Sequence, residues 1–394
     1  MLSARELLVS LMTGLLALIL VVFGVFYYYG CRYIRQGEAA SFRPGPGPWP
    51  RAAVIVPVAG ASAELRENLR SRLIQDYPDY QVIFAVRSEA DPAAGVIKTL
   101  LPEFPLARLV LCGPASGCSQ KNHNLLMGIQ AAAPDVAVLV FSDANQTTPA
   151  HWLQALVQPL ARGEALVSSS YHHVIPQDTH LATLGRSLAV FMIYLGKGIA
   201  SWDQPWGGST AIKRQAFDEL QISRLWSQTV VDDVSLAKRL QEARVKMAAA
   251  VGGVLATPAR ENLASWENWF IRQIIYLKFY FYLPWLLAGV GLFALLGVTL
   301  LALAHLGLAV LGWAAWTSTG PSLVVLLSLV VFLGLIRPVH PGPGPWPRYL
   351  NAALLTLIMA AWCHYRTWFA WGLRWRHLYY TVDRQGLVTG IQEV

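Results

Sequence analysis

The chain has 394 residues, of which 55% are hydrophobic and only 14% are charged, and its formal net charge is +8. Soluble domains are about 45–50% apolar and about 25% charged, so this composition excludes a wholly soluble protein and a disordered one. In so apolar a chain the basic charge suits anionic lipid headgroups, and we expect no nucleic acid partner. The four cysteines share no metal-ligand spacing, which indicates neither a disulfide scaffold nor a zinc site.

The first predicted element is a transmembrane anchor over residues 1–31. The stretch from Leu8 to Gly30 carries no charge and is long enough to cross a bilayer of about 30 Å. It is too long for the apolar core of a signal peptide, and the tyrosines at 27–29 end it as an aromatic belt would. Because Arg32 and Arg35 follow it, the positive-inside rule places the next domain in the cytoplasm.

Residues 44–264 predict an α/β domain, because short β-rich runs alternate there with longer helical stretches. The predicted strands are 52–58, 81–86, 108–112 and 136–141. This order predicts a mostly parallel sheet with right-handed crossovers. Ligands bind such sheets beyond the carboxyl ends of the strands, so the residues that follow each strand are the candidates for a site.

Acidic residues stand at these positions. Asp91 comes after the second predicted strand and Asp143 after the fourth, and a further pair, Asp232 and Asp233, comes later in the domain. Carboxylates gathered at one cleft bind a hard cation such as Mg²⁺ or Mn²⁺, accept hydrogen bonds from sugar hydroxyls, or act as a general base. Asp91 and Asp143 also suit the simpler role of capping the helices that follow them.

The rest of the chain returns to the membrane. Residues 265–282 are rich in Trp, Tyr and Phe, which predicts either an interfacial aromatic helix or the start of the next span. Residues 283–373 predict a transmembrane region with three or four crossings, and 374–394 a cytosolic tail. The sequence PGPGPWPR occurs at 44–51 and again at 341–348, which are predicted to be extended linkers at membrane exits. If both copies lie on one face, the number of crossings between them is even.

Six segments of the α/β domain resemble a known family. These segments are VIVPVAG (54–60), DYPDYQVIFAV (76–86), EADPA (89–93), QKNHNL (120–125), FSDAN (141–145) and VDDVSLAKRL (231–240). In this order they resemble the inverting family 2 glycosyltransferases, and most closely the ceramide glucosyltransferase branch, family 21. The resemblance implies a Rossmann-like GT-A domain between transmembrane helices. It also implies non-processive transfer of a sugar, most simply glucose, from a UDP-sugar to the hydroxyl of a membrane lipid, most simply ceramide.

The resemblance also implies roles for the acidic residues. Asp91 would lie near the nucleotide, and Asp143 with Asn145 would hold Mg²⁺ or Mn²⁺ at the donor diphosphate. Asp233 would be the base that deprotonates the acceptor, with Asp232 as the alternative.

Further residues follow from the same resemblance. Arg272 matches the arginine of the final (Q/R)xxRW motif and would assist the departing diphosphate. The donor side would also include Pro57 and Lys121. The acceptor side would be formed by Trp206, Gly207, Gly208 and Trp269.

The chain departs from the family pattern in two places. The final motif reads Trp269-Phe-Ile-Arg272-Gln273, so neither its first position nor its Trp is kept, and a second register starting at Gln273 would put Tyr276 and Leu277 at the Arg and Trp positions. The altered motif argues against a processive polysaccharide synthase. The second aspartate site reads Asp-Ala-Asn, which leaves one carboxylate for a metal.

Two other interpretations stay open. The same chemistry could use diacylglycerol, a hopanoid-type lipid or a polyprenyl phosphate as the acceptor. In a different class, the chain would be a membrane scaffold or transporter with a degenerate nucleotide-binding domain. All of these place it as a multi-pass membrane protein with its soluble domain in the cytoplasm, in a bacterial inner membrane or a Golgi or endoplasmic reticulum membrane. The tail motif Trp375-Arg376 followed by Tyr379-Tyr380 resembles the tail of lipid glycosyltransferases or else anchors the chain at anionic lipid.

Overall fold

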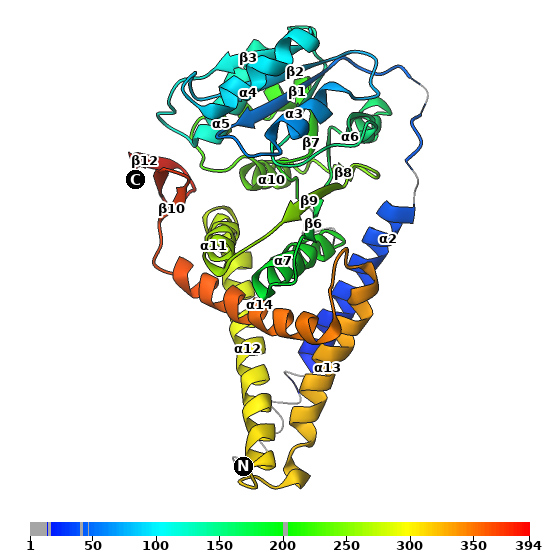
Figure 1. Cartoon of the computed structure of the whole chain (residues 1–394), viewed down its shortest axis with the longest axis vertical. Coiled ribbons are helices and arrows are strands. Elements are labelled where there is room, and N and C mark those ends of the chain that lie inside the picture. The colour runs from blue at the N-terminus through cyan, green and yellow to red at the C-terminus, as the bar shows by residue number, and fades with distance from the viewer. Residues whose placement is uncertain (1–13, 15–16, 40–41, 46, 200–203) are drawn as a thin grey trace.

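The structure is a computed structural model that describes residues 14, 17–39, 42–45, 47–199 and 204–394. An α/β domain lies at one end, apolar helices lie at the other, and a layer of helices that run crosswise separates them (Figure 1). Residues 1–13 of the expected anchor, and 200–203 near the expected acceptor side, lie outside the described residues.

A seven-stranded sheet in the order β3-β2-β1-β4-β7-β5-β8 forms the centre of the α/β domain. Its strands are β1 (Ala52–Val58), β2 (Tyr80–Val86), β3 (Ala107–Leu111), β4 (Val138–Phe141), β5 (Val167–Ser169), β7 (Thr210–Lys213) and β8 (Met247–Ala249). The first four are mutually parallel, and β7 runs antiparallel to its neighbours β4 and β5. The mostly parallel sheet expected from the sequence is therefore confirmed.

Helices cover both faces of this sheet because its strands are apolar on both sides. Along β1, Ala52, Val54 and Val56 belong to one core, while Ala53 and Ile55 belong to the other, as the two-residue repeat of a strand requires. The helices of the first core are α3 (Leu65–Leu73), α4 (Pro92–Leu100) and α6 (Trp152–Ala161). Those of the second are α5 (Gln120–Ala131), α8 (Arg214–Glu219), α9 (Ile222–Trp226) and α10 (Asp233–Glu242).

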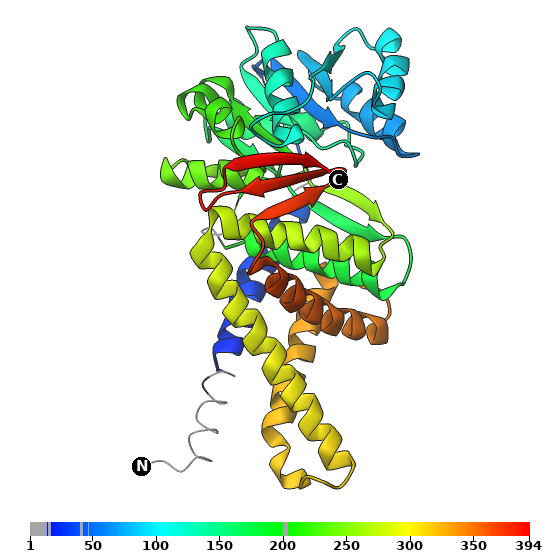
Figure 2. The same ribbon diagram turned by 90° about the vertical axis from the view of Figure 1, so that its left-hand side faces the viewer.

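A second, two-stranded parallel sheet connects this domain with the crosswise helices. It pairs β6 (His172–Pro176) with β9 (Leu255–Ala259). The crosswise layer consists of α7 (Leu181–Lys197), α11 (Leu263–Tyr280) and α14 (Trp346–Thr367), as Figure 2 also shows. The predicted aromatic helix thus exists as α11, and its place at a membrane surface stays a prediction.

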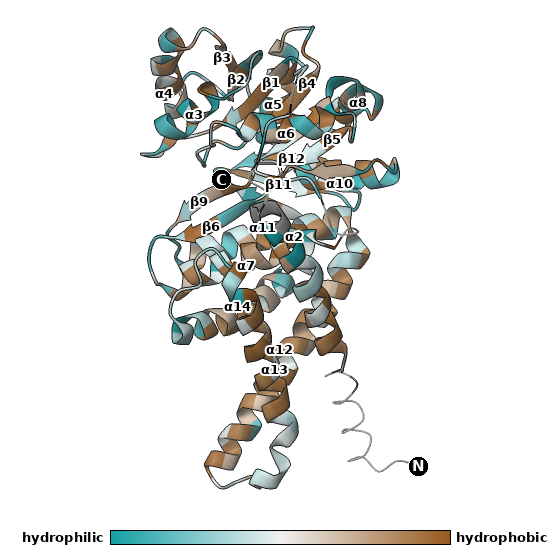
Figure 3. Ribbon diagram, turned by 90° about the vertical axis from the view of Figure 1, so that its right-hand side faces the viewer, coloured by the Kyte–Doolittle hydropathy of each residue, from teal (hydrophilic) through white to brown (hydrophobic). Residues whose placement is uncertain are grey.

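Three helices of the described chain are long and apolar enough to cross a membrane: Ala17–Arg35, Tyr282–Val310 (α12) and Gly320–Val339, which contains α13 (Gly320–Ile336). Hydrophobic residues predominate along the visible side of α12 and α13 (Figure 3). Only two of the three helices, α12 and α13, lie in the C-terminal region where we expected three or four crossings. The stretch expected to form the last span is α14, which carries Arg348, His364 and Arg366 and lies crosswise to α12 and α13 (Figure 1).

The expected cytosolic tail is a folded antiparallel sheet of β10 (Gly372–Trp375), β11 (Leu378–Val382) and β12 (Val388–Glu393). This C-terminal sheet packs on the α/β domain, where the Gln120 amide donates a hydrogen bond of 3.1 Å to Tyr380 Oη and the Val388 amide one of 2.8 Å to the Gln228 carbonyl. Both ends of the α12–α14 region therefore meet the same domain. If α12 and α13 each cross a bilayer, α14 does not, and both Pro-Gly linkers lie on one face.

Candidate active site

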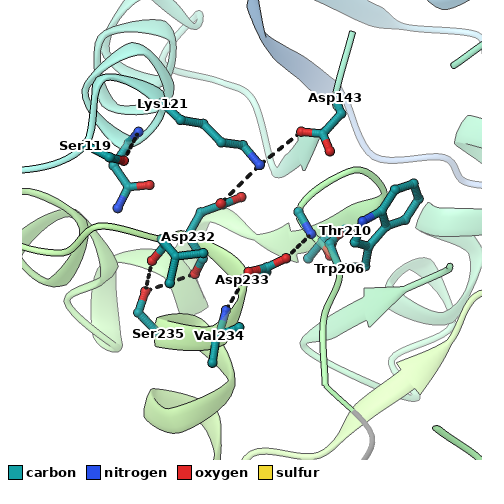
Figure 4. A network of polar contacts seen from close by, with 12 residues as sticks. Ser119, Lys121, Asp143, Trp206, Thr210, Asp232, Asp233, Val234 and Ser235 are labelled. Atoms are coloured by element: carbon teal, nitrogen blue, oxygen red, sulfur yellow. Dashed lines mark hydrogen bonds and ion pairs between the residues drawn. The ribbon is translucent and has the colours of Figure 1, made fainter. Parts of the chain in front are cut away.

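Four of the predicted site residues meet at the carboxyl ends of the central strands. Lys121 lies in the first turn of α5, Asp143 follows β4, and Asp232 and Asp233 begin α10. Figure 4 shows their side chains converging from these separate elements. We refer to these four residues as the Lys121 cluster.

Lys121 joins two of the acids. Its Nζ lies 2.9 Å from Asp143 Oδ1 and 3.0 Å from Asp232 Oδ1. Burial alone would lower the pKa of this ammonium, but Asp143, Asp232 and Asp233 outweigh it and raise the pKa well above its ordinary value. Lys121 therefore carries a fixed positive charge at the centre of the cluster.

The adjacent aspartates differ in their surroundings. The Asp232 carboxylate is 3% exposed and ion-paired with Lys121, while its backbone carbonyl accepts a hydrogen bond of 3.0 Å from Trp226 Nε1. Asp233 turns the other way, and its carboxylate accepts hydrogen bonds from the amides of Gly207 (3.0 Å) and Val234 (2.7 Å). Burial, followed by the charge of Asp232, raises the pKa of Asp233 to about 6. This difference makes Asp233 the better placed proton acceptor near neutral pH.

The loop at 204–209 fixes this geometry from the opposite side. A Cβ on Gly207 would lie 2.3 Å from Asp232 Oδ2 and 2.8 Å from Lys121 Nζ, so only glycine fits there. A Cβ on Gly208 would meet the Trp206 ring at 2.3 Å. Trp206 in turn stacks on the buried His172 ring with centroids 4.5 Å apart. His172 therefore lies against a predicted acceptor-side residue.

The residues around Lys121 in the Gln-Lys-Asn-His-Asn segment hold the cluster together. Asn122 donates to the Thr229 carbonyl at 3.0 Å, which ties α5 to the loop that carries Asp232 and Asp233. Asn124 donates to the Ala85 carbonyl at the end of β2, and Gln120 to the Gly113 carbonyl after β3. We did not predict these three residues, although their polar side chains on an otherwise core-facing helix were a visible indication.

Asp143 is the residue that fits a metal. Buried Arg72 holds its loop by donating to the Asp143 carbonyl at 2.6 Å and to the Gln146 carbonyl. Among the described residues no group of three His, Cys, Asp or Glu could hold a metal alone, and the predicted partner Asn145 is exposed. Mg²⁺ and Mn²⁺ nevertheless often take one or two carboxylates and complete their shell with substrate phosphates and water. The donor set therefore fits a metal that arrives with a diphosphate.

Asp91 lies apart from the cluster, beyond the end of β2. Its Oδ1 accepts hydrogen bonds from the Gly60 amide (2.8 Å) and the Ala93 amide (2.9 Å), so it caps α4, as the simpler interpretation expected. It also lines a cavity of about 540 Å³. Pro57, another predicted donor-side residue, lies near the carboxyl end of β1, paired in register with Ala85 of β2. We refer to this cavity as the Asp91 pocket.

The last predicted residues lie on α11, one of the crosswise helices. Arg272 lies one turn before Tyr276, and burial raises the pKa of Tyr276 to about 12, while the charge of Arg272 lowers it and that of Asp233 raises it. The Arg272 guanidinium makes no hydrogen bond or ion pair within the part of the chain that the structure describes. Trp269 lies under the Arg186 guanidinium at 4.7 Å. Residues four apart share one face of a helix, and the charges of Asp233 and Asp232 act on Tyr276. Either register of the final motif, with its arginine position at Arg272 or at Tyr276, therefore places that position on the same face of α11.

Comparisons with known proteins agree with this arrangement. The family model described as Glycosyl transferase family 21 matches residues 15–388. Ceramide glucosyltransferase 1 of Caenorhabditis elegans is 23% identical over 233 residues, which cover 56% of this chain and 48% of that protein. A ceramide glucosyltransferase of Komagataella phaffii is 29% identical over 129 residues, 31% of this chain and 25% of that protein. The chain thus matches about half or less of the length of these curated relatives.

One solved structure is similar over nearly the whole chain. It is the mannosyltransferase PcManGT from Pyrobaculum calidifontis in complex with GDP-Man and Mn²⁺, with a TM-score of 0.54 and 19% identity, covering 89% of this chain and 99% of that one. At this identity the similarity concerns the fold alone. The GT-A fold expected from the sequence is confirmed.

Proposed function

Because the chain belongs to glycosyl transferase family 21, we propose that this glycosyltransferase moves glucose from UDP-glucose to the hydroxyl of ceramide in the membrane, with inversion at the anomeric carbon. The relatives named ceramide glucosyltransferases support the donor and the acceptor. The observation that carries the proposal is that Asp233, whose pKa is raised, lies in one cluster with the ammonium of Lys121, which Asp143 and Asp232 hold in place. One group takes a proton, and the other stabilises negative charge.

Asp233 is the general base of the proposed reaction. Its carboxylate removes the proton from the acceptor hydroxyl as the oxygen attacks the anomeric carbon from the face opposite the diphosphate. The carbon–oxygen bond to the diphosphate breaks in the same displacement, and UDP leaves with the bonding electron pair. A positioned base contributes about 10²–10⁴-fold to such a rate. Asp232 is committed to Lys121, which favours Asp233 over its neighbour for this role.

Negative charge that develops on the leaving diphosphate meets two cations of the chain. Lys121 holds its ammonium between Asp143 and Asp232, and Arg272 offers a planar guanidinium from α11. Fixed charges of this kind stabilise a transition state without reorganising. A Mg²⁺ or Mn²⁺ ion held by Asp143 and Asn145 would supply further charge neutralisation at the diphosphate.

The crosswise helices account for a lipid acceptor. The ceramide tails would stay in the bilayer while the hydroxyl reaches Asp233 past Trp206, Gly207, Gly208 and Trp269. The three candidate spans would hold the site at this surface, and we place the α/β domain in the cytoplasm, where UDP-sugars are available. The membrane would be a bacterial inner membrane, or a Golgi or endoplasmic reticulum membrane in a eukaryote.

The test is transfer by the full-length protein in detergent, offered a panel of UDP-sugars and a total lipid extract, with products identified by mass spectrometry. We expect a hexosyl lipid from UDP-glucose and ceramide. Asp233→Asn should lower its yield about 10³-fold, whereas Asp232→Asn should retain a larger part of the activity. Equal activity in wild type and Asp233→Asn would overturn the choice of base. The absence of any glycolipid from the wild type would favour the non-catalytic scaffold or transporter, and a product on diacylglycerol, a hopanoid or a polyprenyl phosphate would replace the acceptor.

A further inference from the structure

The Asp91 pocket has a wall that the α/β domain does not supply. Arg87, Asp91 and Pro92 line it from beyond β2, and Gly113 and Pro114 from beyond β3. One further lining residue, His377, comes from the turn that joins β10 to β11 of the C-terminal sheet. The C-terminal sheet thus supplies one wall of a pocket whose other residues lie far earlier in the sequence, since His377 and Arg87 are 290 residues apart.

This wall is held in place by polar contacts. Arg87 is ion-paired with Glu393 of β12 at 2.7 Å, and its Nη1 lies 2.9 Å from His377 Nε2. A guanidinium can only donate, so His377 Nε2 is the acceptor and the proton of the neutral ring is on Nδ1. Among the described residues no acceptor meets Nδ1, so His377 has one donor left for a ligand in the pocket. Asp91 has an acceptor to match it, because only its Oδ1 receives hydrogen bonds among the described residues.

The other residue of the turn, Arg376, reaches a neighbouring strand end. A Cβ built on Gly60, just past β1, would lie 2.6 Å from Arg376 Nη1, so the guanidinium rests on that loop. In the sheet, β1 lies between β2 and β4. Arg376 is therefore placed along the path from the Asp91 pocket to Asp143.

The backbone of Arg376 gives a second reason to look at this residue. Register pairs Trp375 with Leu378, which leaves Arg376 and His377 as a two-residue hairpin loop. Arg376 has a φ of 56°, in the left-handed region that favours glycine at such positions. Glycine would adopt this backbone conformation at a lower cost, so the presence of an arginine side chain at position 376 requires an explanation.

We propose that the C-terminal sheet is part of the donor site, with His377 contacting the nucleoside in the Asp91 pocket and the Arg376 guanidinium contacting the diphosphate that runs from it toward Asp143. The pocket has the volume of a small-molecule site, and its proline faces, one acceptor and one donor suit a base and a ribose. This assignment rests on the proposed function, since it requires a nucleoside diphosphate sugar as the donor.

The decisive variant is Arg376→Gly, in full-length protein in detergent, with His377→Ala beside it and Arg384→Ala as the control. Arg384 is an exposed arginine in the other turn of the same sheet. We expect Arg376→Gly to unfold at the same or a higher temperature because the turn accepts glycine. Its dissociation constant for UDP and its KM for the UDP-sugar should nevertheless rise about tenfold to a hundredfold, the effect of losing a charged hydrogen bond, with KM for the lipid unchanged.

His377→Ala should raise the same two constants about fivefold to tenfold, as loss of a neutral hydrogen bond does, and Arg384→Ala should change neither. If the wild type transfers sugar and binds UDP while Arg376→Gly and His377→Ala keep wild-type constants, the donor role of the C-terminal sheet is wrong and the proposed function stands. If the wild type neither binds UDP nor transfers sugar, both proposals are wrong.

Discussion

The two ends of the candidate site are built in different ways. In the Lys121 cluster the charged side chains are buried or half-buried and are fixed by ion pairs or backbone hydrogen bonds, whereas the Asp91 pocket is open and takes one wall from the C-terminal sheet. A preorganised set of charges is what stabilises a transition state, and an open pocket is what a soluble ligand needs to enter and leave. The difference predicts that changes in the cluster lower kcat, while changes in the pocket raise KM for the donor.

The largest effect is expected from Asp233→Asn, which tests the catalytic end most directly. The amide keeps the shape of the carboxylate and one oxygen for the Gly207 amide, but it cannot take a proton. We expect kcat to fall about 10³-fold with KM for the UDP-sugar changed less than twofold, measured by steady-state kinetics. A rise in the KM for the UDP-sugar with unchanged kcat would contradict the assignment of the Lys121 cluster to catalysis and of the Asp91 pocket to donor binding.

Gly207→Ala should have the next largest effect, without removing any charged group. The new methyl would meet Asp232 Oδ2 at 2.3 Å and Lys121 Nζ at 2.8 Å and push this ion pair out of position. A displacement of about 1 Å at a catalytic group costs about 10²-fold in rate, so we expect kcat to fall by that factor. Gly95→Ala on α4 is the matched control, because a Cβ there meets nothing within 4 Å, and its kcat should equal that of the wild type.

At the pocket end, Asp91→Asn should act on binding. Asparagine is as good a helix cap as aspartate, so α4 should keep its start and the thermal midpoint should change little. Loss of the negative charge and of the second carboxylate oxygen should raise donor KM about tenfold with kcat nearly unchanged. An unchanged donor KM would show that Asp91 serves only as the helix cap, and its role in the pocket would be wrong.

The smallest effect is the dependence of the rate on pH. The pKa of Asp233 is raised to about 6, so its carboxylate is ionised and able to accept a proton above that pH and is protonated below it. The value of kcat/KM should reach a plateau above about pH 7 and lie about fourfold lower at pH 5.5. Asp233→Asn should lose this limb from its residual activity. A flat profile from pH 5 to 8 in the wild type would argue against Asp233 as the base.

The sequence predicted much of this molecule because its indications were local. Continuous apolar runs such as Ala52–Val58 are typical of a strand covered on both faces, and Asp143 stands where a ligand-side residue of a parallel sheet must stand. The C-terminal sheet gave no such indication, since its hairpin turns on Arg376-His377 rather than on Gly or Asn. The crosswise position of α14 depends on the docking of the C-terminal sheet on the α/β domain. This is a long-range contact that the hydropathy of the α14 segment does not indicate. The ion pairs of Lys121 also could not be predicted, because Asp143 and Asp232 are distant from Lys121 in the sequence and only the fold brings them together.

The return of the last strands to the first domain has a consequence for biogenesis. If α12 and α13 cross the bilayer as a hairpin, residues 372–394 can dock beside Gln120 only after both helices have crossed. A newly made chain that inserted one of these helices and not the other would carry its final strands to the wrong compartment. The Asp91 pocket of such a chain would lack the wall that His377 supplies, and proteases should degrade the chain. The pocket would therefore be complete only in correctly inserted chains.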